Sequence, residues 1–270
     1  MSEVSYRSAT AVVSGRPSPK IWADCPVISF LKDPSKGFHE FEDFLSPAAG
    51  ATTVAGHRFY SYIDTNGTLV LSDDEKGVLR IMTDEDDNDA LVLITGNNTS
   101  GCITPANASK NKWWFEARIK CATITDGDVA LFVGLTEEGQ AADTKPMADD
   151  GTHAINDIDH VGFHVAGDDG DGVNLVWNLS GQTAQSTADV HTLEADTWVQ
   201  LGLKYEPKDN KVHVYVDGVE NKDAAFLMSH ASAPADCLAV CLAIKADGTC
   251  AVTDYLYVDW VRYAAEYDRS

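Results

Sequence analysis

Apolar and polar residues alternate with a period of two along most of the chain from about residue 111 onward. In WWFEARIK, residues 113–120, every second residue is apolar and the residues between them are mainly charged. The same alternation recurs over residues 129–135, 161–165 and 173–177. Successive side chains of a strand point to opposite faces, so this pattern predicts strands that bury one face.

The C-terminal third adds a predicted hairpin. TWVQLGLKYE, residues 197–206, and KVHVYVDG, residues 211–218, are separated by the turn formers Pro, Lys, Asp and Asn, which predicts two antiparallel strands. Further strands are predicted over residues 238–244 and 255–263. Many short strands separated by polar loops predict an all-β fold, an antiparallel two-sheet sandwich.

The first 110 residues divide differently. Residues 1–50 mix Pro, Ser and Gly with scattered apolar residues, and we interpret them as an N-terminal arm or extension of a sandwich domain over residues 51–270. Within the arm, GFHEFEDFL at residues 37–45 is compatible with a short helix or an edge strand. Strand-like segments over residues 57–95 are expected to pair into the same sandwich.

Composition excludes several classes of function. With 20 Lys and Arg against 42 Asp and Glu, the formal charge is −22, which opposes binding to nucleic acid or to an anionic membrane surface. No segment reaches the roughly 20 apolar residues of a membrane helix, and the N-terminus has no signal-like apolar stretch, so we expect synthesis in the cytoplasm. The six cysteines form no CxxC motif and are expected to be free thiols.

The order of these strand motifs resembles the concanavalin A-like lectin/glucanase superfamily. FEARIK, VALFVGL, HVGFH, WVQLGLKYE, KVHVYVDG and YVDWVRY carry the resemblance, over roughly residues 55–265. It implies a jelly roll of two antiparallel sheets for residues 51–270 but does not fix the function. GFHEFEDFL, GVLRIMTDEDDNDALVL, WFEARIK and VGLTEE also resemble structural proteins encoded by tailed bacteriophages.

The glucanases of this superfamily need two carboxylates on one strand face. Retaining glycosidases place them about 5 to 5.5 Å apart, and family 16 members carry E-x-D-x-x-E or E-x-D-x-E after their FEARIK-like strand. The corresponding stretch here, DGTHAINDIDHVGFHV, offers Asp157 and Asp159 and then Val161 and Phe163. The glutamate pair is absent, so we expect no enzymatic activity.

Sugar-binding members of the superfamily use exposed aromatic, amide and acidic side chains. Trp114, His164 and Asn174 are the candidate glycan-binding residues here. Trp177 is in phase with the apolar face of its strand and is predicted to lie in the core.

Two acidic loops have compositions that can bind Ca²⁺. AGDDGDGVN at residues 166–174 and the acidic run over residues 84–89 contain closely spaced Asp residues. A polar hairpin turn and a solvated acidic face are the interpretations we favour, so no metal or other cofactor is expected.

The resemblance to tailed-phage structural proteins implies a virion protein, and the absent glutamate pair favours a non-enzymatic one. We therefore predict a decoration or cement protein on the outer capsid surface that is made in the host cytoplasm. Its expected partners are the major capsid protein and further copies of itself. The arm is a candidate capsid-docking segment, or else a flexible leader without a role; its docking candidates are Pro17, Pro19, Trp22, Pro26 and Phe30. The alternative functions are a carbohydrate-binding adhesion module of a head fibre or tail, with a host glycan as partner, and a divergent glycoside hydrolase.

Overall fold

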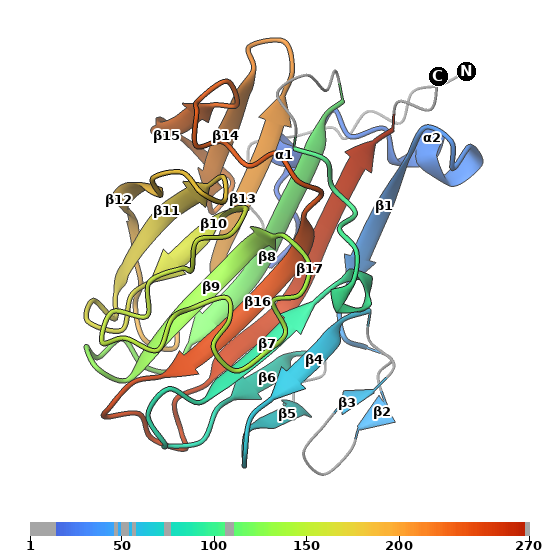
Figure 1. Cartoon of the computed structure of the whole chain (residues 1–270). Helices are drawn as coiled ribbons and strands as arrows, with labels where there is room; N and C mark the ends of the chain where they lie inside the picture. Colours follow the sequence, from blue (N-terminus) through green and yellow to red (C-terminus); the bar gives the residue numbers. More distant parts are fainter. Residues whose placement is uncertain are drawn as a thin grey trace.

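The computed structural model describes residues 15–45, 58–72, 77–105 and 111–267, and the backbone of residues 48–49 and 54–55. Two antiparallel sheets pack face to face, with one short helix against the outside of one of them and a second at its edge (Figure 1). The predicted all-β, two-sheet antiparallel sandwich is therefore confirmed.

The first sheet has eight strands. β1 (Gly37–Glu42) pairs with one of them, β17, outside the main strand order. That order is β15 (Val219–Leu227), β14 (Lys211–Val216), β13 (Val199–Glu206), β8 (Trp113–Cys121), β17 (Leu256–Glu266), β6 (Leu79–Met82) and β5 (Thr68–Leu71).

The second sheet has seven strands, and a small separate pair lies beside the sandwich. The order is β12 (Gln185–Thr192), β11 (Gly172–Asn178), β10 (His160–Val165), β9 (Val129–Thr136), β16 (Ala239–Ala246), β7 (Ala90–Ile94) and β4 (Tyr60–Ile63). A 3-10 turn, η1 (Gly96–Asn98), follows β7. The small pair is β2 (Ala48–Ala49) with β3 (Val54–Ala55).

The core lies between the two sheets and follows the period of two. Phe115 of β8, Val133 of β9 and Leu242 of β16 point inward and are buried together. Their chain neighbours Glu116 and Phe132 belong to the outer faces. Alternation along each strand thus assigns one set of side chains to the core and the other to an outer face.

The predicted hairpin is present. β13 and β14 pair antiparallel, with Leu201 opposite Val216 and Glu206 opposite Lys211. The next turn, which joins β14 to β15, contains Asp217 and Gly218 with φ values of 49° and 70°. Two consecutive residues at positive φ are the requirement of a type I′ hairpin turn, which explains the Asp-Gly pair there.

The N-terminal segment is part of the folded body. α1 (Pro19–Trp22) and α2 (Val27–Lys32) precede β1, so GFHEFE is an edge strand and not a helix. β1 pairs along the C-terminal half of β17, ahead of the predicted boundary at residue 50, which itself lies outside the described residues. Among the helices that the structure describes, none is long and apolar enough to cross a membrane.

Candidate functional site: the two outer faces of the sandwich

The outer face of the seven-stranded sheet is covered by the long connection between β9 and β10, residues 137–159, hereafter the covering loop (Figure 1). Met147 of this loop is buried against Phe132 of β9, and Ile155 packs on the same cluster. The sheet contributes mainly small apolar side chains to this contact: Ala90, Val92, Ile94, Ala130, Ala239, Cys241 and Ala243. This face is therefore a second, smaller core.

A buried lysine ties the covering loop to the sheet. Lys245 of β16 is fully buried, and its Nζ forms an ion pair with Asp149. The same ammonium donates hydrogen bonds to the carbonyl oxygens of Asp143, at 3.2 Å, and Met147, at 3.4 Å. Because a buried ammonium is costly unless it is paired and hydrogen-bonded, these contacts favour packing of the covering loop against the sheet.

Two histidines of β10 lie beneath the covering loop. His160 Nδ1 is 2.9 Å from the carbonyl oxygen of Ile158, and His164 Nε2 is 3.0 Å from that of His153. Burial disfavours the imidazolium form and lowers the pKa of each histidine to about 4. His164, a predicted glycan-binding residue, is thus neutral near pH 7 and occupied by a contact within the chain.

Asp157 and Asp159, which occupy the place of the catalytic carboxylates in the sequence, stabilise turns. Asp159 is buried, and its Oδ2 accepts hydrogen bonds from the backbone N–H groups of Ala235, at 2.7 Å, and Asp236, at 2.9 Å. Asp157 Oδ1 accepts one from the backbone of Gly181 at 2.9 Å. Both carboxylates thus stabilise loops by accepting backbone hydrogen bonds.

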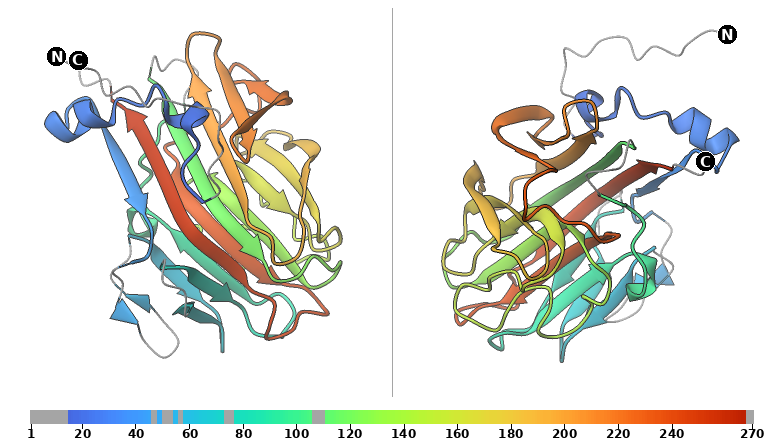
Figure 2. Two further views of the ribbon diagram at one scale, coloured as in Figure 1. Left: turned by 180° about the vertical axis from the view of Figure 1, so that it is seen from behind. Right: turned by 45° about the horizontal axis from the view of Figure 1, so that its top comes forward.

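The outer face of the eight-stranded sheet is covered in part by the N-terminal segment (Figure 2). Glu116 of β8 is fully buried there and accepts hydrogen bonds from the Ser18 backbone N–H, at 2.9 Å, and from Trp22 Nε1, at 2.7 Å. Burial raises the pKa of Glu116, and the hydrogen bonds from Ser18 and Trp22 partly offset the rise. The pattern of β8 predicted a charged face at Glu116. In the structure Ser18 and Trp22, which lie far away in the sequence, bury this carboxylate.

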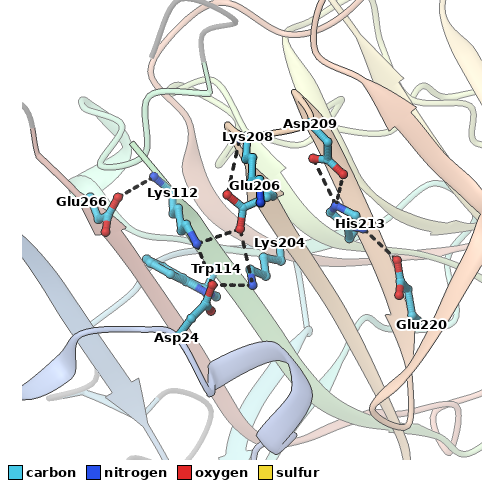
Figure 3. A network of polar contacts seen from close by, with 10 residues as sticks. All are labelled: Asp24, Lys112, Trp114, Lys204, Glu206, Lys208, Asp209, His213, Glu220 and Glu266. Carbon is cyan, nitrogen blue, oxygen red and sulfur yellow. Dashed lines mark hydrogen bonds and ion pairs between the residues drawn. The ribbon is translucent and has the colours of Figure 1, made fainter. Parts of the chain in front are cut away.

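Trp114, another predicted glycan-binding residue, lies beneath the same segment. It is fully buried, and its Nε1 donates a hydrogen bond to Asp24 Oδ1 at 3.1 Å. Figure 3 shows Lys112 and Lys204 converging on Asp24, with Nζ–Oδ2 distances of 2.8 and 2.7 Å. Partial burial alone would raise the pKa of Asp24, but hydrogen bonds from the two lysines and Trp114 hold it below its usual value. Trp114 therefore positions the arm and is not exposed for stacking on a sugar.

The five predicted docking residues lie along this arm. Pro19 opens α1, Pro26 immediately precedes α2, and Pro17 is half-buried. Trp22 and Phe30 are buried in one cluster with Trp114 and Tyr215 of this chain's own sheet: Ile21, Trp22, Phe30, Trp114, Tyr215 and Ala264. The two aromatic side chains of the arm are therefore occupied within the chain.

α2 presents other apolar side chains to solvent. Ile28 is 57% exposed and Leu31 is 74% exposed, while Phe30 between them faces the sheet. The helix projects from the edge of the molecule beside β1 (Figure 2). Ile28 and Leu31 could not be singled out from the sequence, because a six-residue helix is too short to show a periodicity.

A row of aromatic and basic side chains crosses the part of the eight-stranded sheet that α1 and α2 do not cover. Lys120 of β8 lies opposite Tyr257 of β17, which lies opposite Arg80 of β6. Lys120 Nζ is 4.4 Å from the centre of the Tyr257 ring and 5.4 Å from that of Trp198, and Arg118 also stacks on Trp198, at 4.4 Å. These five side chains are partly exposed, the Arg118 side chain by 12%, and we call them the aromatic-basic row.

The remaining sequence candidates lie in the β10–β11 region. Asn174, the third predicted glycan-binding residue, is half-buried, and its Oδ1 accepts a hydrogen bond from the backbone of Asp189 at 3.1 Å. Trp177 is in the core, as predicted, and stacks on Phe226 with ring centres 4.3 Å apart. The structure thus does not bring Trp114, His164 and Asn174 together into one exposed site.

The acidic loops form turns. Residues 166–171 connect the antiparallel strands β10 and β11, as a polar hairpin turn does. In the other loop, Asp84 Oδ1 accepts a hydrogen bond from the backbone of Asp86 at 2.9 Å. Burial and a hydrogen bond with Asp84 raise the pKa of Asp89 to about 7.

Comparison with known proteins identifies the fold. No protein-family model and no curated protein sequence matches the chain. Among solved structures, a protein of unknown function, SO2946 from Shewanella oneidensis MR-1, is similar over 87% of this chain and 89% of its own, with a TM-score of 0.56 and 15% identity. An endo-1,3-beta-glucanase from Streptomyces sioyaensis is similar over 86% of this chain and 97% of its own, with a TM-score of 0.52 and 12% identity.

A lectin-type domain is similar to the same degree. The carbohydrate recognition domain of Emp47p covers 97% of its own length and 86% of this chain, with a TM-score of 0.51 and 14% identity. At such identities the likeness concerns architecture alone. The chain therefore has the jelly-roll fold of the concanavalin A-like lectin/glucanase superfamily.

Proposed function

We propose that this chain is a non-enzymatic structural protein of a tailed-bacteriophage particle, a decoration or cement protein on the outer surface of the capsid. The observation that carries the proposal is α2, which holds Ile28 and Leu31 in solvent while Phe30 fixes the helix to the sheet. Residues three apart in a helix are neighbours, so Ile28 and Leu31 form one exposed apolar patch, and contiguous patches of this kind mark protein contacts. The resemblance of several segments to phage structural proteins supports the choice of partner.

The mechanism is physical. α2 would contact the major capsid protein and bury Ile28 and Leu31, at roughly 25 cal/mol for each Å² of apolar surface removed from water. Further copies of the chain would bind around the symmetry axes of the shell. Because each copy binds only the assembled shell, it lowers the free energy of that state relative to the burst one. A charge of −22 suits a surface that faces outward, away from the packaged nucleic acid.

The test is binding of purified protein to particles that lack it. The double variant Ile28→Asp/Leu31→Asp should lose most of its binding, since it places two charges in the apolar contact. The matched control is Val252→Asp, which changes a side chain that is 49% exposed in the turn between β16 and β17. Equal binding by the two variants and the unmodified chain would refute a docking role for α2.

The absence of catalysis is part of the proposal. The covering loop fills the outer face of the seven-stranded sheet, and Asp157 and Asp159 accept backbone hydrogen bonds. Incubation with linear β-glucans should therefore release no reducing ends. Product release that disappears in Asp157→Asn or Asp159→Asn would contradict this part of the proposal.

The aromatic-basic row favours a second candidate function, carbohydrate binding by an adhesion module. Trp198 and Tyr257 offer half-exposed rings, and rings of this kind can stack on sugars. This candidate predicts saturable binding to a glycan that is lost in Trp198→Ala. If the protein binds no glycan on an array of host-surface glycans, carbohydrate binding is excluded.

A further inference from the structure

A buried histidine in the covering loop has one unsatisfied ring nitrogen. His153 is 1% exposed, and its Nδ1 lies 3.1 Å from the carbonyl oxygen of Ala148, to which it donates a hydrogen bond. Nε2 is shielded from solvent and has no hydrogen-bond partner. With the proton on Nδ1, Nε2 carries a lone pair and requires a donor or a cation.

Two carboxylates from other loops meet this nitrogen. Asp247, which directly follows β16, has its Oδ1 at 3.7 Å from His153 Nε2. Asp87, in the loop between β6 and β7, completes the group, and the three ligand atoms lie within 4.8 Å of one another. In the neutral histidine two anionic oxygens and a lone pair therefore face one space, an arrangement that is repulsive unless a cation or a proton on Nε2 lies between them.

Gly167 leaves the space that the side chains of Asp247 and His153 occupy. A Cβ atom on Gly167 would lie 2.3 Å from Asp247 Oδ2 and 2.8 Å from His153 Cδ2. A side chain at residue 167 would therefore displace both ligands. The loop is also fixed behind the histidine, because the backbone N–H of Gly167 donates a hydrogen bond to the carbonyl of Thr152 at 3.1 Å.

We propose that Asp87, His153 and Asp247 bind a divalent first-row transition-metal cation, with Zn²⁺ as the best match. An imidazole nitrogen with two carboxylate oxygens suits Zn²⁺, whereas Ca²⁺ and Mg²⁺ prefer oxygen ligands alone. Metal–ligand bonds of about 2.0 to 2.2 Å place neighbouring ligand atoms roughly 3.3 Å apart in a tetrahedral site. The three ligand atoms, which lie within 4.8 Å of one another, would draw together on the cation, and exposed Asp87 would leave the fourth position to water.

The site would act as a clamp on the covering loop. Its three ligands come from the loop between β6 and β7, from the covering loop and from the turn after β16. A cation held by all three fixes the covering loop at a point beyond the Lys245 contacts. The bound metal would thus be structural, stabilising the closed outer face of the seven-stranded sheet.

The experiment is isothermal titration of the full chain with ZnCl₂, after treatment with a chelator. A Cys237→Ser background removes an exposed thiol that would compete for zinc. We expect one Zn²⁺ per chain, with affinity at least tenfold weaker in Asp87→Asn and no binding in His153→Gln. Glu85→Gln, which removes the same charge from an exposed neighbour two residues away, should stay within about twofold.

A second readout separates a clamp from adventitious binding. Zinc should slow amide hydrogen exchange over residues 145–156 of the covering loop in the background protein and leave it unchanged in His153→Gln. The proposal is overturned if zinc does not bind, if Glu85→Gln weakens binding as much as Asp87→Asn, or if binding persists in His153→Gln. Displacement of zinc by equimolar Ca²⁺ would overturn the assigned metal class.

Discussion

The contact between Trp22 and Glu116 gives the sharpest prediction about stability. Trp22→Phe keeps an aromatic ring beneath the guanidinium of Arg262, which stacks on Trp22 at 4.0 Å. It removes the indole N–H that donates to Glu116 Oε2 at 2.7 Å. A hydrogen bond to a charged group contributes about 1.5–3 kcal/mol, and the smaller ring buries less apolar surface, at roughly 25 cal/mol per Å². We therefore expect Trp22→Phe to lower the free energy of unfolding by about 3 kcal/mol.

Urea unfolding followed by circular dichroism measures this loss. The slope of the free energy of unfolding against urea should not change, because the fold is retained. Trp198→Phe is the matched control. Trp198 is partly exposed and stacks on Arg118 and Lys120, so this variant should lower the free energy of unfolding by no more than about 1 kcal/mol. Trypsin should also cleave after Lys20 faster in Trp22→Phe than in the control. A loss below about 0.5 kcal/mol in Trp22→Phe would refute the docked arrangement of the arm.

Three further predictions concern the outer face of the seven-stranded sheet. Asp159→Ala should lower the free energy of unfolding by about 3 kcal/mol or more, since it removes two hydrogen bonds from backbone N–H groups to a buried carboxylate; urea unfolding unchanged from the unmodified chain would contradict this. Lys245→Met should speed amide exchange over residues 143–150, because methionine fills the site but cannot bind the loop carbonyls. Global stability should change by about 1 kcal/mol at most, because the Asp149 side chain is 40% exposed and water can solvate it once the lysine is gone. Unchanged exchange would show that the lysine does not hold the loop. Stability should also fall as the pH drops from about 6.5 towards 4, because the pKa values of His160 and His164 are about 4 in the folded chain and about 6.5 in the unfolded one. By linkage each histidine lowers the free energy of unfolding by roughly 2 kcal/mol at pH 5. Asp89, whose pKa is raised to about 7, acts in the opposite sense. A His164→Gln variant whose stability has the same pH dependence as that of the unmodified chain would contradict the role of His164.

The strands and the core could be predicted from the sequence because alternation is a local property. Phe115 and Val133 are in phase with their apolar neighbours, and both lie between the sheets. The hairpin of β13 and β14 could be predicted from the turn formers between the two segments.

The outer faces could not be predicted, since alternation does not distinguish a solvated face from one that another segment covers. Glu116 and Trp114 alternate with core residues, and both are buried by an arm from the start of the chain. His164 lies beneath a loop whose position depends on contacts such as that between Lys245 and Asp149. Those contacts link residues far apart in the sequence and have no periodicity of their own.

The most direct test of the proposed function is cryo-electron microscopy of particles purified from the replicon that encodes this chain. The proposal predicts density for the sandwich in many symmetric copies on the outer shell, with α2 (Val27–Lys32) directed at the capsid protein. Density for the chain only at fibres or the tail, or its absence from the particles, would contradict a decoration role.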